Sequence, residues 1–193
     1  MSYILVRRAH GCKLFALLLV FLAGCAAQPA ASDVAQVDRL LALIDQRLGF
    51  MDDVARNKWN SGAPIEDLPR EAEIIDSLGR QAAGFGIDAE IVRGFFRAQI
   101  EASKTIQRAR FAEWRVRNQP PFKNPPDLRD TIRPALDALT PEMMKALAGA
   151  LQVLRLTGGA SLVNSRAAIM PGAGTSNAIA RDQAIAPLVR VAR

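Results

Sequence analysis

The chain has 193 residues, of which 50% are hydrophobic and only 6% aromatic, a composition that suits one core of helices packed through Ala, Leu, Ile and Val. Its formal net charge is +6, but three of the 25 basic residues and none of the 19 acidic residues lie within the first 25 positions, which leaves +3 for the rest. That surplus is too small to predict a nucleic-acid-binding protein.

The first 25 residues have the pattern of an export signal. Basic residues at Arg7, Arg8 and Lys13 precede an apolar run from Leu14 to Ala23. The run is much shorter than the ~20 residues that a membrane-spanning helix needs, so a stable transmembrane segment is not expected. We therefore predict a mature protein outside the cytoplasm, in the periplasm.

The sequence Leu22-Ala23-Gly24-Cys25 ends this leader and resembles a bacterial lipobox, in which the cysteine becomes the lipidated first residue of the mature chain. We expect a protein anchored to the membrane through Cys25. The alternative is an ordinary signal cut at a position within Ala27 to Ala31, with Cys25 discarded. Cys12 lies in the leader under both interpretations, so the mature chain is expected to form no internal disulfide.

The remainder of the chain is patterned as helices. A short tether at 26–32 precedes a helical domain at 33–157, followed by weaker C-terminal helical segments, or a tail, at 158–193, of which the last dozen residues are expected to fray. Apolar spacing and Gly/Pro breaks predict helices at 33–59, 66–83, 89–117, 127–139 and 140–156. Asp88, Asp127 and Thr140 occupy the expected N-cap positions. Because no strand alternation is present, the predicted fold is all-α, a single-domain helical bundle.

Two cations interrupt the apolar stripe of the first predicted helix. Arg47 and Lys58 are 11 residues apart, or about three helical turns, so both project from nearly the same side. They could face one pocket. Alternatively, each is a snorkelling side chain or an ordinary surface charge.

Polar groups with helical spacing also occur in the next two predicted helices. Asp67, Arg70 and Glu71 stand at i, i+3 and i+4, which fits either a ligand site or simple complementation of the helix dipole with a local ion pair. Ser103 and Gln107 stand four residues apart on an otherwise apolar stripe. Buried polar groups need partners, so these two either share a ligand or form a satisfied core network.

The order and spacing of these motifs resemble the AroQ chorismate mutases, especially their exported gamma subclass. The matching stretches are Ile44-Asp45-Gln46-Arg47-Leu48, Lys58-Trp59, Pro64-Ile65-Glu66-Asp67 with Arg70-Glu71, and Gln99-Ile100-Glu101-Ala102-Ser103 through Gln107. The resemblance spans residues 33–117 clearly and 127–133 weakly. It implies an AroQ-type all-α bundle that isomerises chorismate to prephenate in aromatic amino acid biosynthesis, most simply as a homodimer.

The resemblance implies that three arginines bind the two carboxylates of chorismate. Arg47, Arg70 and, through a weaker match, Arg133 would hold these groups, and Ser103 would assist one of them. The sequence departs from the exported subclass in one respect, since many of its members have a disulfide in the C-terminal half and this chain cannot form one.

The resemblance also implies how the reacting groups are addressed. Lys58 and Gln107 would donate hydrogen bonds to the ether oxygen, while Asp67, through its backbone, and Glu71 would address the ring hydroxyl. Lys58, Gln107, Glu71 and Arg47 are therefore the expected catalytic residues. Other family members have Glu at the position of Gln107, so the pH optimum is expected to vary within the family.

Such a reaction is pericyclic, so positioning and fixed hydrogen-bond donors suffice without a nucleophile, a metal or a cofactor. The one histidine, His10, lies in the leader, and the mature sequence has no metal-binding cluster or phosphate loop motif. The alternative function is a non-catalytic helical envelope lipoprotein that binds a partner or a small dianion. Convergence of Arg47, Lys58, Arg70 and Gln107 on one cavity would favour the enzyme.

Overall fold

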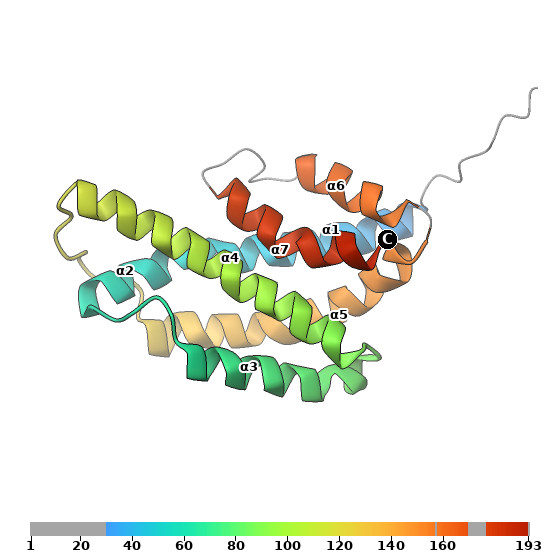
Figure 1. The fold of residues 1–193 in the computed structure, drawn as a ribbon, viewed down its shortest axis with the longest axis horizontal. Coiled ribbons are helices and arrows are strands. Elements are labelled where there is room, and N and C mark those ends of the chain that lie inside the picture. Colours follow the sequence, from blue (N-terminus) through green and yellow to red (C-terminus); the bar gives the residue numbers. More distant parts are fainter. Residues whose placement is uncertain (1–29, 157, 170–176, 193) are drawn as a thin grey trace, which may run out of the picture.

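The computed structural model describes residues 30–156, 158–169 and 177–192, and every regular element within them is a helix (Figure 1). The elements are α1 (Ala31–Gly49), α2 (Met51–Ser61), α3 (Leu68–Gln81), the 3₁₀ helix η1 (Ala82–Phe85), α4 (Ala89–Val116), the π-helix η2 (Leu128–Ile132), α5 (Arg133–Leu154), α6 (Gly159–Ile169) and α7 (Ala178–Val191). The all-α prediction is confirmed. No helix in the described ranges is long and apolar enough to cross a membrane. The predicted leader and Cys25 lie outside these ranges.

Helix α4 is the long central element of the bundle. Its N-terminus is fixed by Asp88, whose Oδ1 accepts hydrogen bonds from the backbone N–H groups of Glu90 (2.8 Å) and Ile91 (3.2 Å), as the sequence predicts. Helix α4 packs against α3 and α7, while α5 packs mainly against α1, and α6 packs against α7 and α1 (Figure 1). Phe95 and Ile106 are almost fully buried along it, so α4 contributes to the core along most of its length.

The first predicted helix is divided into α1 and α2 at Phe50, so the single span 33–59 was wrong in this detail. The Phe50 N–H bonds to the carbonyl of Arg47 at 3.3 Å, a tightened turn next to Gly49, a poor helix former. The predicted stripe is nevertheless buried on both helices, at Val37, Leu41, Ile44, Leu48, Met51 and Ala55. Arg47 and Lys58 therefore remain on one side of the chain despite the break.

The boundary predicted between helices at 127–139 and 140–156 was also wrong. Residues 128–132 form η2, and α5 then continues through Pro141 without a break. Asp127 caps η2, its Oδ1 accepting from the N–H groups of Arg129 and Asp130 at 2.7 Å each. Thr140 is not an N-cap, because its hydroxyl donates to the Leu136 carbonyl (2.9 Å) inside the helix.

Of the last dozen residues, 182–191 lie in helix α7 and do not fray, which corrects the prediction for the described part of the C-terminus. Helix α7 buries Ala184, Ile185 and Leu188, and it packs along α4 (Figure 1). Arg181, only 6% exposed, forms a bidentate ion pair with Asp45 of α1 at 2.7 and 3.2 Å. The segment predicted as a tail at 158–193 is thus, in its described residues, part of the same core as α1 and α4.

Candidate active site

A cavity of about 560 Å³ lies on the α3 and α5 side of α4. Its walls come from α1, α2, the segment leading into α3, α3 itself, α4, η2 and α5. It is lined by all eight residues that the sequence assigns to the substrate, namely Arg47, Lys58, Asp67, Arg70, Glu71, Ser103, Gln107 and Arg133. Residues that are up to 86 positions apart in the sequence therefore meet around one space.

Arg47 stands in the last turn of α1 and faces the cavity. Its Nε is buried without a hydrogen-bond partner in the structure. Burial lowers the pKa of Arg47 to about 10, an effect that the nearby carboxylate of Asp137 opposes. The side chain thus stays a cation at neutral pH, and its unpaired donor is suited to an incoming anion.

Lys58 stands in the last turn of α2 and is half-buried. Its Nζ donates to the backbone carbonyl of Ile65 at 2.7 Å, which leaves further N–H groups for a ligand. Burial lowers the pKa of Lys58, the carboxylates of the segment that begins α3 oppose this, and Arg133 adds to the lowering as a like charge. The ammonium group thus has carboxylates and a guanidinium group as neighbours.

The turn that begins α3 is held together by its own side chains. Asp67 is the N-cap, and its Oδ1 accepts from the Arg70 N–H at 3.4 Å. The Asp67 backbone N–H in turn donates to Oε1 of Glu71 at 3.1 Å. This capping arrangement is a further local explanation of the spacing, beside dipole complementation and a local ion pair, and it lies at the wall of the cavity.

Ser103 and Gln107 are buried on α4, at 5% and 4% exposure. The Ser103 hydroxyl donates to the Gln99 carbonyl at 2.7 Å, and Gln107 Nε2 donates to the Ser103 carbonyl at 3.2 Å and contacts Met51 Sδ at 3.8 Å. Gln107 Oε1 has no partner. The core network is therefore incomplete, because the Gln107 amide has one weak contact to sulfur and one unsatisfied oxygen.

Arg133 is the first residue of α5 and, with η2, closes the side of the cavity near Lys58. Its position follows from the sequence only through the weak end of the resemblance. Pro134 does not disturb it, because proline in the first turn of a helix lacks an N–H that would have no partner there anyway.

Sequence reasoning missed Lys104, which also lines the cavity and is only 5% exposed. Its Nζ pairs with Glu71 Oε2 and Glu101 Oε1, each at 2.8 Å. Burial disfavours the charged form, but the hydrogen bonds to the two carboxylates outweigh it and raise the pKa of Lys104. The available signal was its position between Ser103 and Gln107, three residues after an acidic residue.

The arrangement presents more positive than negative groups to the cavity. Five cations line it, at Arg47, Lys58, Arg70, Lys104 and Arg133, against four carboxylates, at Asp67, Glu71, Glu73 and Asp137. Apolar residues from α3, α4 and α5 form the rest of the wall, among them Ile74, Phe96 and Met144. Such a site can bind a small dianion with an apolar ring and direct donors at a chosen oxygen.

Comparison with known proteins identifies chorismate mutases as relatives of this chain. The sequence model of the family described as chorismate mutase type II matches residues 33–108. The secreted chorismate mutase of Mycolicibacterium smegmatis is 34% identical over 139 residues, which cover 70% of this chain and 75% of that protein. The secreted chorismate mutase of Yersinia pestis is 31% identical over 120 residues, covering 62% and 63%. The crystal structure of chorismate mutase from Burkholderia thailandensis superposes with a TM-score of 0.74 at 32% identity, covering 80% of this chain and 99% of that one.

Proposed function

This chain belongs to the chorismate mutase type II family and is an isomerase that converts chorismate to prephenate, and we propose that the cavity between α3, α4 and α5 is where the rearrangement occurs. The observation that supports this location is the convergence of Arg47, Lys58, Arg70 and Gln107 on one cavity. Membership of the family favours the catalytic function over a non-catalytic lipoprotein.

The substrate carboxylates would be bound by cations from three elements. Arg47 offers a buried Nε without a partner, and Arg70 and Arg133 approach from α3 and α5. The Ser103 hydroxyl would assist by turning from the Gln99 carbonyl towards the ligand, since its proton is now used within α4. Groups on opposite walls can hold the substrate in the compact form that the reaction needs.

In the rearrangement one carbon–oxygen bond breaks while one carbon–carbon bond forms, and negative charge grows on the ether oxygen. Lys58 would stabilise that charge with an N–H group not used by Ile65. Gln107 would donate from Nε2, exchanging its weak contact to Met51 Sδ for the ether oxygen. Both donors are already fixed before the substrate binds, so little reorganisation accompanies the reaction.

The ring hydroxyl would be addressed at the start of α3. Glu71 already accepts one hydrogen bond at each carboxylate oxygen, and each oxygen has a further lone pair for a ligand hydroxyl. The Asp67 backbone N–H is engaged by Glu71, so a direct bond to the substrate requires Glu71 to release it. Glu71 is therefore the stronger candidate of the two.

The location of the site can be tested by comparing KM for chorismate between alanine variants of Arg133 and Arg129. Arg133→Ala should raise KM for chorismate by roughly tenfold or more, since a charged hydrogen bond to a carboxylate is typically worth about 1.5–3 kcal/mol. Arg129→Ala is the matched control, because Arg129 is exposed one turn earlier and does not line the cavity. Equal kinetics of both variants and the wild type would exclude Arg133 from the site.

The protein is exported, in keeping with its secreted relatives, and we propose that Cys25 anchors it to the membrane through a lipid. The support is the sequence Leu22-Ala23-Gly24-Cys25. In cells that express the full chain, the wild type should fractionate with membranes and carry a lipid mass at Cys25, whereas Cys25→Ser should not. A soluble wild-type protein that begins within Ala27 to Ala31 would refute the anchor.

We also propose that the protein is a homodimer, on the strength of the family resemblance. Because the residues named above all come from one chain, dimerisation would pair two complete sites. Light scattering during gel filtration should give twice the mass of one chain. A single-chain mass at micromolar concentration would refute the dimer without affecting the assignment of the site.

A further inference from the structure

Lys104 is a buried cation in the cavity wall, and none of the proposed substrate contacts involves it. Its side chain is 7% exposed and that of Glu71, its partner across the α3–α4 contact, is 19% exposed. Glu101, its second partner, lies on α4 itself and is 49% exposed. Ordinary surface pairs do not bury a lysine to this extent, because removing its charge from water is costly.

The ion pair between Lys104 and Glu71 helps to fix the orientation of the Glu71 carboxylate. Lys104 Nζ holds Oε2 at 2.8 Å, while the Asp67 N–H holds Oε1 at 3.1 Å. With both oxygens engaged from different elements, the carboxylate has one position relative to α4. Glu71 therefore lines the cavity as an oriented acceptor.

The carboxylate of Glu71 is electrostatically unfavourable for this substrate. Chorismate is a dianion, and a partly buried carboxylate in the same cavity repels it more strongly than a solvated one would, because the effective dielectric constant there is lower than in water. Lys104 offsets this charge at a distance of 2.8 Å. Without Lys104, the four cations and four carboxylates that would remain in the lining would balance.

We propose that Lys104 is a positioning residue, which holds Glu71 as an oriented acceptor for the ring hydroxyl and compensates its charge, so that a dianion can bind beside it. Its action is on Glu71 rather than on the reacting atoms. The inference rests on the proposed site, in which Glu71 faces the substrate.

The first test replaces the charge of Lys104. Lys104→Met should raise KM for chorismate by about tenfold, equivalent to ~1.4 kcal/mol, while kcat changes less, because uncompensated repulsion acts on the bound substrate and the transition state alike. Lys104→Gln, which keeps a hydrogen-bond donor without the charge, should show the same rise in KM. Lys104→Arg, which restores the cation, should return KM towards the wild-type value.

The second test asks whether Lys104 acts through Glu71. In the double variant Lys104→Met/Glu71→Gln, the carboxylate that Lys104 compensates in the cavity lining is absent, and Glu101, which also loses its partner, is half exposed and does not line the cavity. KM should therefore fall below that of Lys104→Met and approach that of Glu71→Gln alone. If Lys104 merely supported the fold, the two losses would add. Additive losses would therefore overturn the proposal, as would a Lys104→Gln variant with unchanged KM.

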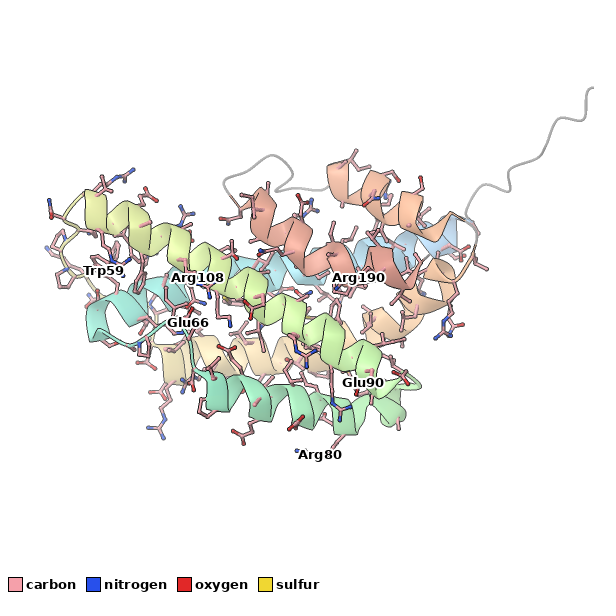
Figure 2. The ribbon with its side chains drawn as sticks, viewed as in Figure 1. Trp59, Glu66, Arg80, Glu90, Arg108 and Arg190 are labelled. Carbon is pink, nitrogen blue, oxygen red and sulfur yellow. The ribbon has the colours of Figure 1, made fainter. Side chains whose placement is uncertain are left out.

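The chain provides a matched control on the same helix. Arg108, four residues after Lys104, also pairs with an acidic residue next to α3, since its Nη2 and Nε lie 2.5 and 3.1 Å from Glu66 Oε1 (Figure 2). Neither residue of this pair lines the cavity, and both are about half exposed. Arg108→Met should leave KM unchanged, and an equal rise in both variants would mean that general charge, not Glu71, is responsible.

Lys58→Ala distinguishes this inference from the proposed site. If Lys58→Ala keeps full activity, the site itself is wrong. If Lys58→Ala is inactive while Lys104→Met and Lys104→Gln behave as the wild type, the site stands and only the role of Lys104 fails.

Discussion

The Nζ atom of Lys58 and the carbonyl oxygen of Ile65 lie 2.7 Å apart across the turn between α2 and α3. The turn itself depends on Gly62, which ends α2 with φ +69°. One hydrogen bond therefore fixes the ammonium group of the cavity to the segment that positions Asp67 and Glu71. The cation and the α3 acceptors are placed as one unit before any substrate binds.

Replacing Gln107 with glutamate should make activity depend on pH. Only a protonated carboxyl can donate to the ether oxygen, so kcat/KM should rise as pH falls through the pKa of the new residue, which burial raises above its usual ~4.3. Initial rates between about pH 5 and pH 8 would test this dependence on protonation. The wild type is the control, since its amide does not titrate. A Gln107→Glu variant with the same profile as the wild type would exclude the donor role.

We expect Arg47 to lower the free energy of unfolding of the protein while it contributes to substrate binding. Its folded-state pKa, about 10, lies below the ordinary value for arginine, so protonation of Arg47 disfavours the folded state, and this cost is fully present at any pH below about 10. Arg47→Met should therefore increase the free energy of unfolding at neutral pH, by on the order of 1 kcal/mol after the change in packing, while it lowers activity. Urea denaturation measures the difference.

Arg39→Met is the control for this effect, because Arg39 stands on the same helix with 60% of its side chain exposed, 3.7 Å from Glu142. It should change neither stability nor turnover appreciably. A loss of stability in Arg47→Met would show that the arginine contributes more by packing and pairing with Asp137 than burial takes away.

The ion pair of Asp45 with Arg181 should be needed to hold α7 in place. Asp45→Ala leaves Arg181, 6% exposed, without its carboxylate, and breaking a buried pair in this way typically costs about 3–5 kcal/mol. Asp38→Ala, which breaks the more exposed pair with Arg166 in the same layer, should cost distinctly less. Equal losses of urea stability in the two variants would contradict the structural role assigned to Arg181.

The core of this fold is largely predictable because its stripes are regular. Leu41, Ile44 and Met51 are buried where spacing places them, and the breaks near Gly62 and Asp88 end and begin helices as expected. The exceptions are local. Pro141 suggested a helix start, but a helix supported by packing tolerates the loss of one hydrogen bond, and α5 passes through it.

The site was predictable where polar residues break an apolar stripe, as Ser103 and Gln107 do. The burial of Lys104 in the cavity wall and of Arg181 in the core was not predictable, because charged residues on helices are ordinarily solvated and only the fold shows that these two are buried. Their partners come from other elements, Glu71 on α3 and Asp45 on α1, and single-sequence spacing does not reveal such pairs.

Loss of chorismate absorbance, with prephenate confirmed as the product, is the most direct test of the central claim when it is followed in Lys58→Ala. We expect kcat to fall by roughly 10²–10³, the effect of removing one preorganised donor to a developing oxyanion, with an unchanged helical circular dichroism spectrum. Lys145→Ala, which removes a 66% exposed lysine, should be fully active. Wild-type turnover by a folded Lys58→Ala would contradict the claim that this cavity performs the rearrangement.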